Sequence, residues 1–497
     1  MSIVDEKETK KIISDIFSIF RGRLDAIQCL DYILSLIFLK YISDLICDIN
    51  EDRVSDNDLR LKEFLSNVPK GMSFYSISSG INHGGIGERI NTALSFYDEA
   101  IFQSLYKCDG AIFSDIDFTS DRLGPRRGRD AFLSELMHIF HSREFQFNYY
   151  NDGADRINLI CSILFEKTAS EAGLRGGDFY TPHGVSALLS ELVSPKAGDS
   201  IYDPACGTGS LLLSAVQKIP DIEKCQSHNV YGQEIIKASW NISYINMFLH
   251  GVYSCKIKWG DVFQNPQFKN SKSELAKFDV VLSNPPFSMS NWGNEEALSD
   301  RFGRFAMGVP PQSKADYAFI LHMIASLKDH TGRMAVVVPH GVLFRGANEA
   351  LIRTNLIKEN LLDAVIGLPE RLFLSTNIPT AILIFRKNKM DSNVLFIDST
   401  TIFENSKGRN YITDEHIKRI LEAFHERQDI CNISHVACLS EIKNNDYNLN
   451  ITRYVKRAEE MQDIDLYSLI DKQEELLAEL HYLEKEMKSY IGYLAIN

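Results

Sequence analysis

Seven short apolar segments between residues 200 and 386 constrain the fold of this chain more than any other feature. Each is rich in β-branched or aliphatic residues, and helix-like patterns follow them along the chain. This alternation predicts a Rossmann-like, doubly wound α/β sheet with helices on both faces. Because ligands bind beyond the carboxyl ends of the strands in such sheets, functional residues are expected directly after these segments. The predicted strands are SIYD (200–203), NVYGQE (229–234), KIKWGD (256–261), FDVVLS (278–283), RMAVVVP (333–339), LDAVIGL (362–368) and TAILIFR (380–386).

Two flanking regions differ in character from this central part. Residues 1–165 carry apolar side chains at intervals of three and four, which predicts an all-helical N-terminal domain. The segment LDYILSLIFLKYISDLI is apolar on more than one face, so this helix is expected to be buried among others. Residues 166–455 then form the predicted catalytic domain, and residues 456–497 form a C-terminal helical tail.

A heptad-like seam runs through the tail, with apolar residues in a 4-3-4-3-4 rhythm among Glu and Lys. This pattern is typical of a coiled-coil-like helix that packs against another helix. Two interpretations stay open, docking on a partner subunit and folding back onto the same chain. The seam consists of Leu476, Leu480, Leu483, Met487, Tyr490 and Leu494.

The charge balance argues against a chain that binds nucleic acid without a partner. Lys and Arg total 53 against 66 Asp and Glu, which gives a net charge of -13, whereas duplex affinity depends largely on neutralising phosphates. The densest basic cluster is RLGPRRGRD (122–130). Since charge runs usually just face water, this cluster is interpreted as a solvated loop. A local basic groove or a basic partner stays open.

Cysteine, histidine and apolar patterns exclude several other classes. The nine cysteines are scattered, which indicates reduced thiols, and no His/Cys cluster has the spacing of a zinc site. His138 and His141 are interpreted as a surface or core pair rather than metal ligands. The N-terminus lacks the apolar core of a signal peptide, and the longest apolar stretch (32–39) is too short to span a membrane. We therefore expect a cytoplasmic protein with no metal and no membrane contact.

A glycine-containing turn follows the first predicted strand, in IYDPACGTGSLLLSA (201–215). Gly207 and Gly209 permit a ligand to approach the backbone closely, and the helix that follows offers free N–H groups. The pattern is not G-x-G-x-x-G, so the dinucleotide fingerprint is not met. Asp203 ends the strand before the turn and would repel a pyrophosphate, whereas a cationic or zwitterionic cofactor tolerates it.

Acidic residues also end the next two predicted strands. Glu234 can accept hydrogen bonds from both hydroxyls of a ribose, and Asp261 can accept from an exocyclic amine. Three carboxylates at successive strand ends suit a nucleoside with positive charge, such as S-adenosylmethionine. Each carboxylate taken alone could also be a helix N-cap or a turn residue. Together with the glycine turn, they favour a cofactor site.

The fourth predicted strand ends in SNPPF, where proline terminates the sheet ladder. An aromatic amine is a poor nucleophile, because its lone pair is delocalised into the ring. The Asn284 side-chain oxygen and the Pro285 carbonyl can accept from its N–H bonds, and the rigidity of Pro285 and Pro286 holds these acceptors in place. Phe287 can stack on the base, which must first be extruded from a duplex. The alternative is a Pro-Pro turn with a buried Phe.

These motifs resemble a known family. DPACGTGS followed by NPPF is similar to the amino-methyltransferases that modify adenine N6 in DNA. GGDFYTPHGVSALLSELV (176–193), SKADYAFILHMIASLKDHTGRMAVVVPHGVLFRG (313–346), LDAVIGLPERLFLSTNIPTAILIFRKNK (362–389) and DYNLNITRYV (446–455) resemble the modification subunit of type I restriction-modification systems. FRGRLDAIQCLDYILSLIFLKYISD (20–44) is similar to the N-terminal helical domain of that family. The resemblance covers nearly the whole chain, in the order found in the family.

The resemblance implies roles for individual residues. Glu234 would hold the ribose of S-adenosylmethionine, Asp261 its adenine amine, and Asn284 to Phe287 the target adenine. Thr208, Gly209 and Ser210 would line the cofactor from the glycine turn. The methionine end of the cofactor would be contacted by Asp178, Phe179, Tyr180, Thr181, Pro182 and His183.

The resemblance also implies partners. Double-stranded DNA would be the substrate, and a separate specificity subunit would read its sequence, alongside a second copy of this chain. A restriction subunit with nuclease and translocase activity is a further partner that the family allows. Since the specificity subunit carries much of the phosphate binding, an acidic modification subunit is physically reasonable.

Two other functions are weighed against this one. Asn-Pro-Pro-aromatic motifs also occur in methyltransferases that act on protein glutamine or RNA, but those resemble only the α/β part. A non-catalytic, cofactor-binding assembly subunit is the second alternative, and the intact set of site residues argues against it. The Gly- and Pro-rich segment 288–313 is expected to be a lid over the extruded base.

Overall fold

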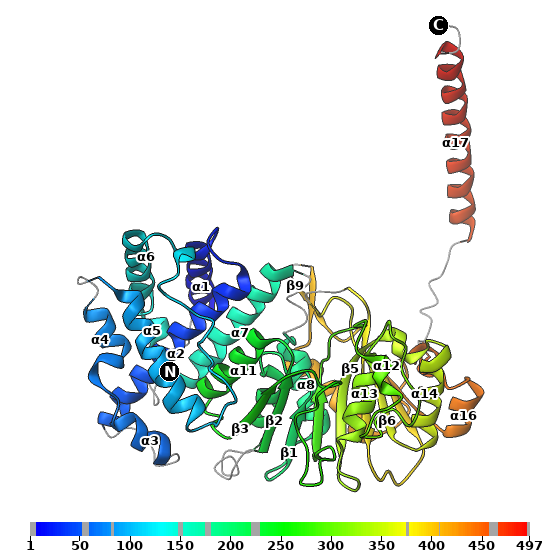
Figure 1. The fold of residues 1–497 in the computed structure, drawn as a ribbon. Helices are drawn as coiled ribbons and strands as arrows, with labels where there is room; N and C mark the ends of the chain where they lie inside the picture. Colours follow the sequence, from blue (N-terminus) through cyan, green and yellow to red (C-terminus); the bar gives the residue numbers. More distant parts are fainter. Residues whose placement is uncertain are drawn as a thin grey trace. The chain divides into compact units, whose positions relative to one another are not determined.

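The computed structural model describes residues 6–51, 59–80, 84–147, 153–173, 180–219, 229–373, 377–406, 408–456 and 466–494. The chain forms two compact units, Met1–Val455 and Lys456–Asn497. The first unit holds the sheet and all the helices labelled in Figure 1 except α17. The predicted division of its residues near position 165 stays a prediction.

A nine-stranded mixed sheet forms the centre of the first unit, in the order β11-β8-β6-β7-β5-β4-β1-β2-β3. All seven predicted strands are confirmed, and β7 runs antiparallel between β5 and β6. The strands are β1 (Ser200–Asp203), β2 (Asn229–Glu234), β3 (Cys255–Trp259), β4 (Val280–Ser283), β5 (Arg333–Pro339), β6 (Leu362–Gly367), β7 (Thr380–Arg386), β8 (Val394–Asp398) and β11 (Ser434–Ala437).

Four strands were not predicted from the sequence. The strand β8 carries the same buried apolar signal as the others, whereas β11 is a short edge strand that pairs antiparallel to β8. The strands β9 (Glu404–Ser406) and β10 (Arg409–Tyr411) form a separate antiparallel pair. Short, partly exposed strands of this kind lack the continuous apolar run that marks a central strand.

Side chains alternate between two cores on opposite faces of the sheet, as the period of two in a strand requires. Ile201, Val280 and Ala335 belong to one core, and Tyr202 and Val281 belong to the other. Helices α8 (His183–Val193), α9 (Ser210–Gln217), α11 (Lys237–Leu249) and α15 (Asp414–Glu426) contribute to the first core, and α13 (Asp316–Ala325), α14 (Ala347–Lys358) and α16 (Leu439–Asn444) to the second. The predicted doubly wound sheet with helices on both faces is confirmed.

The N-terminal region is helical, as predicted. Its α-helices are α1 (Glu6–Phe20), α2 (Ala26–Asn50), α3 (Leu59–Ser66), α4 (Phe74–Ser79), α5 (Ile86–Tyr97), α6 (Arg126–Ile139) and α7 (Gly153–Ala172). Asp25 caps α2 and forms a capping box with Gln28. Short turns of 3-10 or π helix lie at Lys70–Met72, Asp98–Gln103, Asp121–Leu123, Arg143–Phe145, His340–Leu343 and Ile451–Arg453.

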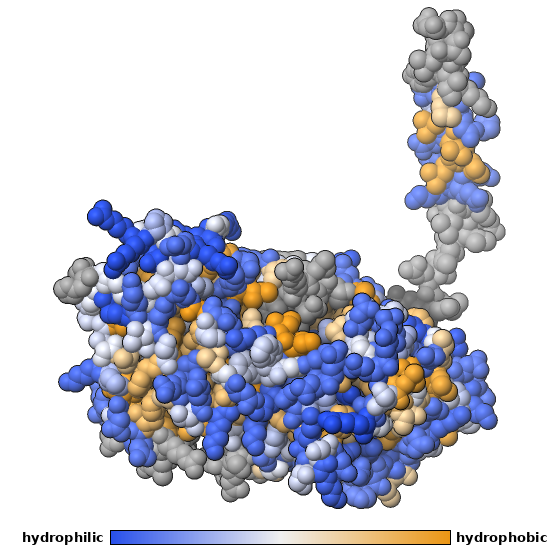
Figure 2. All heavy atoms as spheres, in the orientation of Figure 1, coloured by the Kyte–Doolittle hydropathy of each residue, from blue (hydrophilic) through white to orange (hydrophobic). Residues whose placement is uncertain are grey.

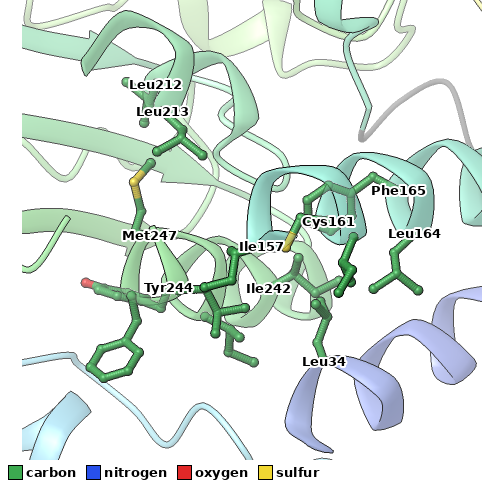
Figure 3. Packing of buried hydrophobic residues seen from close by; sticks show 14 of the residues in the cluster. Leu34, Ile157, Cys161, Leu164, Phe165, Leu212, Leu213, Ile242, Tyr244 and Met247 are labelled. Atoms are coloured by element: carbon green, nitrogen blue, oxygen red, sulfur yellow. The ribbon is translucent and has the colours of Figure 1, made fainter. Parts of the chain in front are cut away.

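The helical region and the sheet share the first core. In Figure 3, Leu34 of α2, Ile157 and Cys161 of α7 and Ile242 of α11 point toward one another. The rings of Phe38 and Phe248 lie 5.1 Å apart between centroids. Helix α2 is buried on most of its circumference because α7 and α11 flank it.

The second unit contains α17 (Leu466–Leu494), so the predicted helical tail is present. Its seam residues Leu476, Leu480, Leu483 and Met487 are 53–57% exposed. The side chains of Tyr490 and Leu494 lie outside the described residues. In the part of the chain that the structure describes, no helix is long and apolar enough to cross a membrane.

Candidate active site

The glycine turn after β1 is shaped by two residues in the left-handed region. Gly207 has φ +54° and Gly209 has φ +78°, conformations that side chains rarely adopt. Gly209 is the N-cap of α9, and a Cβ at this position would lie 3.1 Å from Met247 Cε. The turn is buried at Cys206 to Gly209, and its two glycines keep side-chain atoms away from the backbone where β1 ends.

Asp203 lies beneath this turn and is only 1% exposed. Its Oδ1 accepts hydrogen bonds from the backbone N–H of Ala205 at 2.9 Å and from the Ser283 hydroxyl at 2.7 Å. Burial raises the pKa of Asp203 to about 7, and these hydrogen bonds partly oppose that rise. Because Ser283 ends β4, Asp203 joins the glycine turn to the strand that carries the Asn-Pro-Pro-Phe motif.

Glu234 ends β2 and ties three segments together. Its Oε2 accepts from the backbone N–H of Gly207 at 2.9 Å, and its Oε1 accepts from the N–H of Ile236 at 2.7 Å. Burial raises the pKa of Glu234, while these two N–H donors lower it. Both carboxylate oxygens thus accept from the backbone, which positions the glycine turn. The ribose contact expected of Glu234 stays a prediction.

Asp261 lies two residues beyond the end of β3. Its Oδ1 accepts from the backbone N–H groups of Phe263 at 2.7 Å and Gln264 at 3.3 Å. This is the turn role that was weighed as the alternative for each carboxylate. The side chain is partly exposed, so the same residue remains accessible at the edge of the sheet.

One pocket brings seven of the predicted site residues together, but Glu234 and Asp261 are not part of its lining. It is lined by Tyr180, Thr181, Asp203, Ala205, Cys206, Gly207, Thr208, Ser210, Leu211 and Asn284. Pro182 and His183 begin α8 beside it, and the Thr208 and Ser210 hydroxyls lie 2.7 Å apart. Asp178 and Phe179 lie outside the described residues.

Asn284 carries the most informative contact of the site. Its Nδ2 donates to the Thr181 hydroxyl at 3.1 Å. Its Oδ1 is buried and has no hydrogen-bond partner among the described residues. A buried acceptor without a partner costs about 1–3 kcal/mol, so native proteins rarely keep one without a reason. The amide is therefore held with its oxygen ready for an incoming donor.

Phe287 meets a second aromatic ring that the sequence analysis missed. Its ring centroid lies 5.6 Å from that of Phe373, with an interplanar angle of 78°. Phe373 is buried and follows the carboxyl end of β6. Its position in LPERLFLST, directly after a predicted strand, was the available signal.

The segment after Phe287 starts with a fixed turn. Ser288 has φ +52°, and its backbone N–H donates to Asp316 Oδ1 at 2.8 Å. Arg345 donates to the other oxygen of Asp316 at 2.9 Å and also pairs with Glu349 at 2.9 Å. An ion-pair network thus anchors the backbone immediately beyond the Asn-Pro-Pro-Phe motif.

The segment 288–313 is anchored at a few buried side chains and is otherwise half-buried or exposed, and its expected role as a lid stays a prediction. It includes the short helix α12 (Asn294–Ala297), and Trp292 is 2% exposed with its Nε1 donating to Pro311 O at 3.0 Å. The buried Arg304 donates to the carbonyls of Val262 and Phe263 and pairs with Asp300 at 2.9 Å. Trp292 and Arg304 therefore anchor parts of this segment to the rest of the fold.

Exposed apolar side chains border the carboxylates, which the sequence analysis also missed. Ile235 and Ile236 follow Glu234 and are 57% and 51% exposed, and Trp259 ends β3 with 54% exposed. The Trp259 indole donates to Ile235 O at 2.9 Å, so these residues are neighbours. Large exposed apolar side chains beside the buried Glu234 and the partly exposed Asp261 suit the face of a nucleobase.

Two family profiles match the chain in succession. The profile described as HsdM N-terminal domain matches residues 9–140, and the profile described as N-6 DNA Methylase matches residues 154–463. The chain belongs to the N-6 DNA methylase family. The structure of this methylase is similar to the type I restriction-modification system methyltransferase subunit from Streptococcus thermophilus. That similarity has a TM-score of 0.79 and 30% identity, over 91% of this chain and 100% of that one.

Curated relatives point in the same direction. The methylase is 28% identical to the type I restriction enzyme MpnII methylase subunit of Mycoplasma pneumoniae, over 98% of both chains. It is 30% identical to the HindI methylase subunit of Haemophilus influenzae, over 73% of this chain and 85% of that one.

These matches confirm the predicted class, an S-adenosylmethionine-dependent N6-adenine DNA methyltransferase that is the modification subunit of a type I restriction-modification system. They also account for the N-terminal helical region, which methyltransferases of protein glutamine or RNA would leave unexplained.

Proposed function

We propose that the methylase binds S-adenosylmethionine in the pocket between the glycine turn and Asn284, and methylates an adenine extruded from duplex DNA. In this proposal a separate specificity subunit reads the sequence, and a second copy of the chain completes the complex. The observation that carries the proposal is the buried, unpartnered Oδ1 of Asn284, held in place by Thr181.

The residues of the pocket fit a cationic nucleoside. Asp203 lines the pocket, and Glu234 lies beside it, where it accepts from the backbone N–H of Gly207. These two buried carboxylates would favour a positive charge nearby. Asp261 would accept from the adenine amine, and Ile235 and Trp259 would cover its ring. When bound, S-adenosylmethionine supplies an electrophilic methyl group on its sulfonium.

The chain itself would prepare the nucleophile. Asn284 Oδ1 and the Pro285 carbonyl would accept the two N–H bonds of the adenine amine, which draws its lone pair out of conjugation. Phe287 would stack on the base, and Phe373 would support the Phe287 ring through their edge-to-face contact. Acceptors fixed before the reaction need no reorganisation during it, which is why such groups contribute strongly to rate.

The tail offers a surface for assembly. Leu476, Leu480, Leu483 and Met487 leave an apolar seam exposed on α17, and such seams pack into partner helices. We propose that this helix docks on the specificity subunit in a cytoplasmic complex, to which a restriction subunit would also bind.

The catalytic proposal is tested with Asn284→Ala. We expect calorimetry to show retained S-adenosylmethionine binding, and methyl transfer to duplex DNA in the presence of the specificity subunit to fall about 100- to 1,000-fold. Asn291→Ala, an exposed asparagine of the following segment, is the matched control. Methylation at the wild-type rate by Asn284→Ala would refute the assignment.

The assembly proposal is tested separately. Leu480→Asp with Leu483→Asp should abolish co-purification with the specificity subunit and leave S-adenosylmethionine binding intact. Glu479→Gln on the same exposed helix is the control. Because of the charge of -13, the wild-type chain alone should methylate DNA poorly; efficient site-specific methylation by it would contradict the need for a partner.

A further inference from the structure

Five exposed arginines gather on the N-terminal helical region, and none has a role in the site described above. They are Arg21, Arg23, Arg122, Arg126 and Arg127, here called the arginine patch. Two segments supply them, the turn between α1 and α2 and the segment that enters α6. In Figure 2, strongly hydrophilic side chains gather at the upper left, over α6 and α1 of Figure 1.

Direct contacts join the two segments into one surface. Arg23 donates a hydrogen bond to the carbonyl of Leu123, and its guanidinium lies 4.7 Å from the centroid of the Phe132 ring on α6. Arg129 is buried and pairs with Asp121 at 3.5 Å. The solvated loop expected for residues 122–130 is therefore wrong in part, because helix α6 begins at Arg126 and only some of the arginines face water.

The exposed arginines have no compensating charge. Within the described ranges, Arg21, Arg122, Arg126 and Arg127 take part in no ion pair. Of the carboxylates close to them in sequence, Asp25 caps α2 and Asp121 pairs with Arg129. Asp130 on α6 accepts from the backbone N–H of Gly85 at 3.4 Å. Arg126 and Arg127 also stand in the first turn of α6, where positive charge opposes the helix dipole.

The arginine patch is positively charged, although the chain as a whole has a net charge of -13. A ligand with several closely spaced negative charges would satisfy all five guanidinium groups. Guanidinium groups match phosphate geometry with paired N–H donors, and a duplex presents phosphates in a continuous row. Duplex DNA is already the substrate in the proposed function, so no additional ligand has to be assumed.

We propose that the arginine patch binds the phosphate backbone of the DNA that the methylase modifies. The inference rests on the proposed function insofar as duplex DNA is the substrate. Contacts of this kind position DNA and carry no sequence information. The acidic modification subunit thus contributes its own backbone contacts in addition to those of the specificity subunit.

The test is the salt dependence of DNA binding by the full-length chain assembled with its specificity subunit. The variant is Arg126→Gln with Arg127→Gln, and the probe is a fluorescent duplex titrated between 50 and 200 mM salt. Each lost phosphate contact lowers the slope of log K against log salt by about 0.9, so the slope should fall by about 1.8. The wild type should then lose roughly 12-fold more affinity than the variant over this range.

The matched control is Lys418→Gln with Arg419→Gln, two exposed cations on α15, which should leave the slope unchanged. Methyl transfer at saturating DNA should be unchanged in both variants. A wild-type slope in the arginine variant would overturn the inference, as would failure of that variant to assemble, which would mark the patch as a protein interface. Failure of the proposed function is distinct, because the wild type would then bind the duplex and transfer no methyl group.

Discussion

The contact between Thr181 and Asn284 makes the sharpest prediction. Thr181→Val removes the hydroxyl that accepts from Asn284 Nδ2 at 3.1 Å, while it keeps the side-chain shape. The amide N–H then lacks its partner, at a cost of about 1–3 kcal/mol. If the wild-type hydrogen bond uses this free energy to hold the amide in the reactive orientation, its loss should lower kcat by about 5- to 150-fold.

Single-turnover methylation of duplex DNA by the complex with the specificity subunit measures this loss. Thr181→Ser restores the acceptor hydroxyl, so it should return kcat to within about 2-fold of the wild type. The KM for DNA should change little in either variant, because Thr181 acts on the orientation of Asn284 rather than on the duplex. A higher KM for DNA with an unchanged kcat would contradict this reasoning, because Thr181 would then act on DNA binding.

A double-mutant cycle isolates the coupling between the two residues. Asn284→Ala alone should lower kcat by about 100- to 1,000-fold. In that background Thr181→Val should have no additional effect, since the group that it positions is gone. Equal losses from Thr181→Val in both backgrounds would refute the reasoning, because Thr181 would then act independently of Asn284.

Three further predictions concern charge, burial and close packing. Because burial raises the pKa of Asp203 to about 7, its carboxyl loses a proton as the pH rises through 7, and the charge gained favours a cation. Calorimetric affinity for S-adenosylmethionine should therefore rise from pH 6 to pH 8, and Asp203→Asn should remove this rise. Arg304→Met leaves the carboxylate of Asp300, 6% exposed, without its partner; chemical denaturation should show a loss of about 3–5 kcal/mol. Gly184→Ala places a Cβ 2.2 Å from a backbone carbonyl oxygen and should lower stability by about 1–3 kcal/mol, whereas Gly346→Ala, with no described atom within 4 Å of its Cβ, should unfold at the wild-type temperature.

The sheet was largely predictable because its central strands are buried on both faces. Such strands are continuous apolar runs, and the predicted limits of β1, β2, β5 and β7 coincide with the observed ones. The order of the strands and the antiparallel direction of β7 were not predicted. They depend on how connections cross the sheet, which no local pattern records.

Site residues that follow a strand were predictable in the same way, and their partners were not. Asn284 was placed from its motif, but the hydrogen bond to Thr181 joins residues 103 positions apart. Phe373 meets Phe287 from a different strand end. The burial of Arg304 was unforeseeable, because its acceptors include the backbone carbonyls of Val262 and Phe263 rather than side chains.

The core shared by α2, α7 and α11 has a consequence for protein engineering. Phe38, in the range of one family profile, packs its ring at a tilt of 55° against that of Phe248, in the range of the other. The Tyr106 hydroxyl donates to Val252 O at 3.2 Å between the same two ranges. A chimera that takes residues 9–140 from a relative would set foreign side chains against a native α11. Overpacking or gaps in this shared core would cost about 1–3 kcal/mol for each misfitting side chain. A transplant of the helical region should therefore include the inward face of α11.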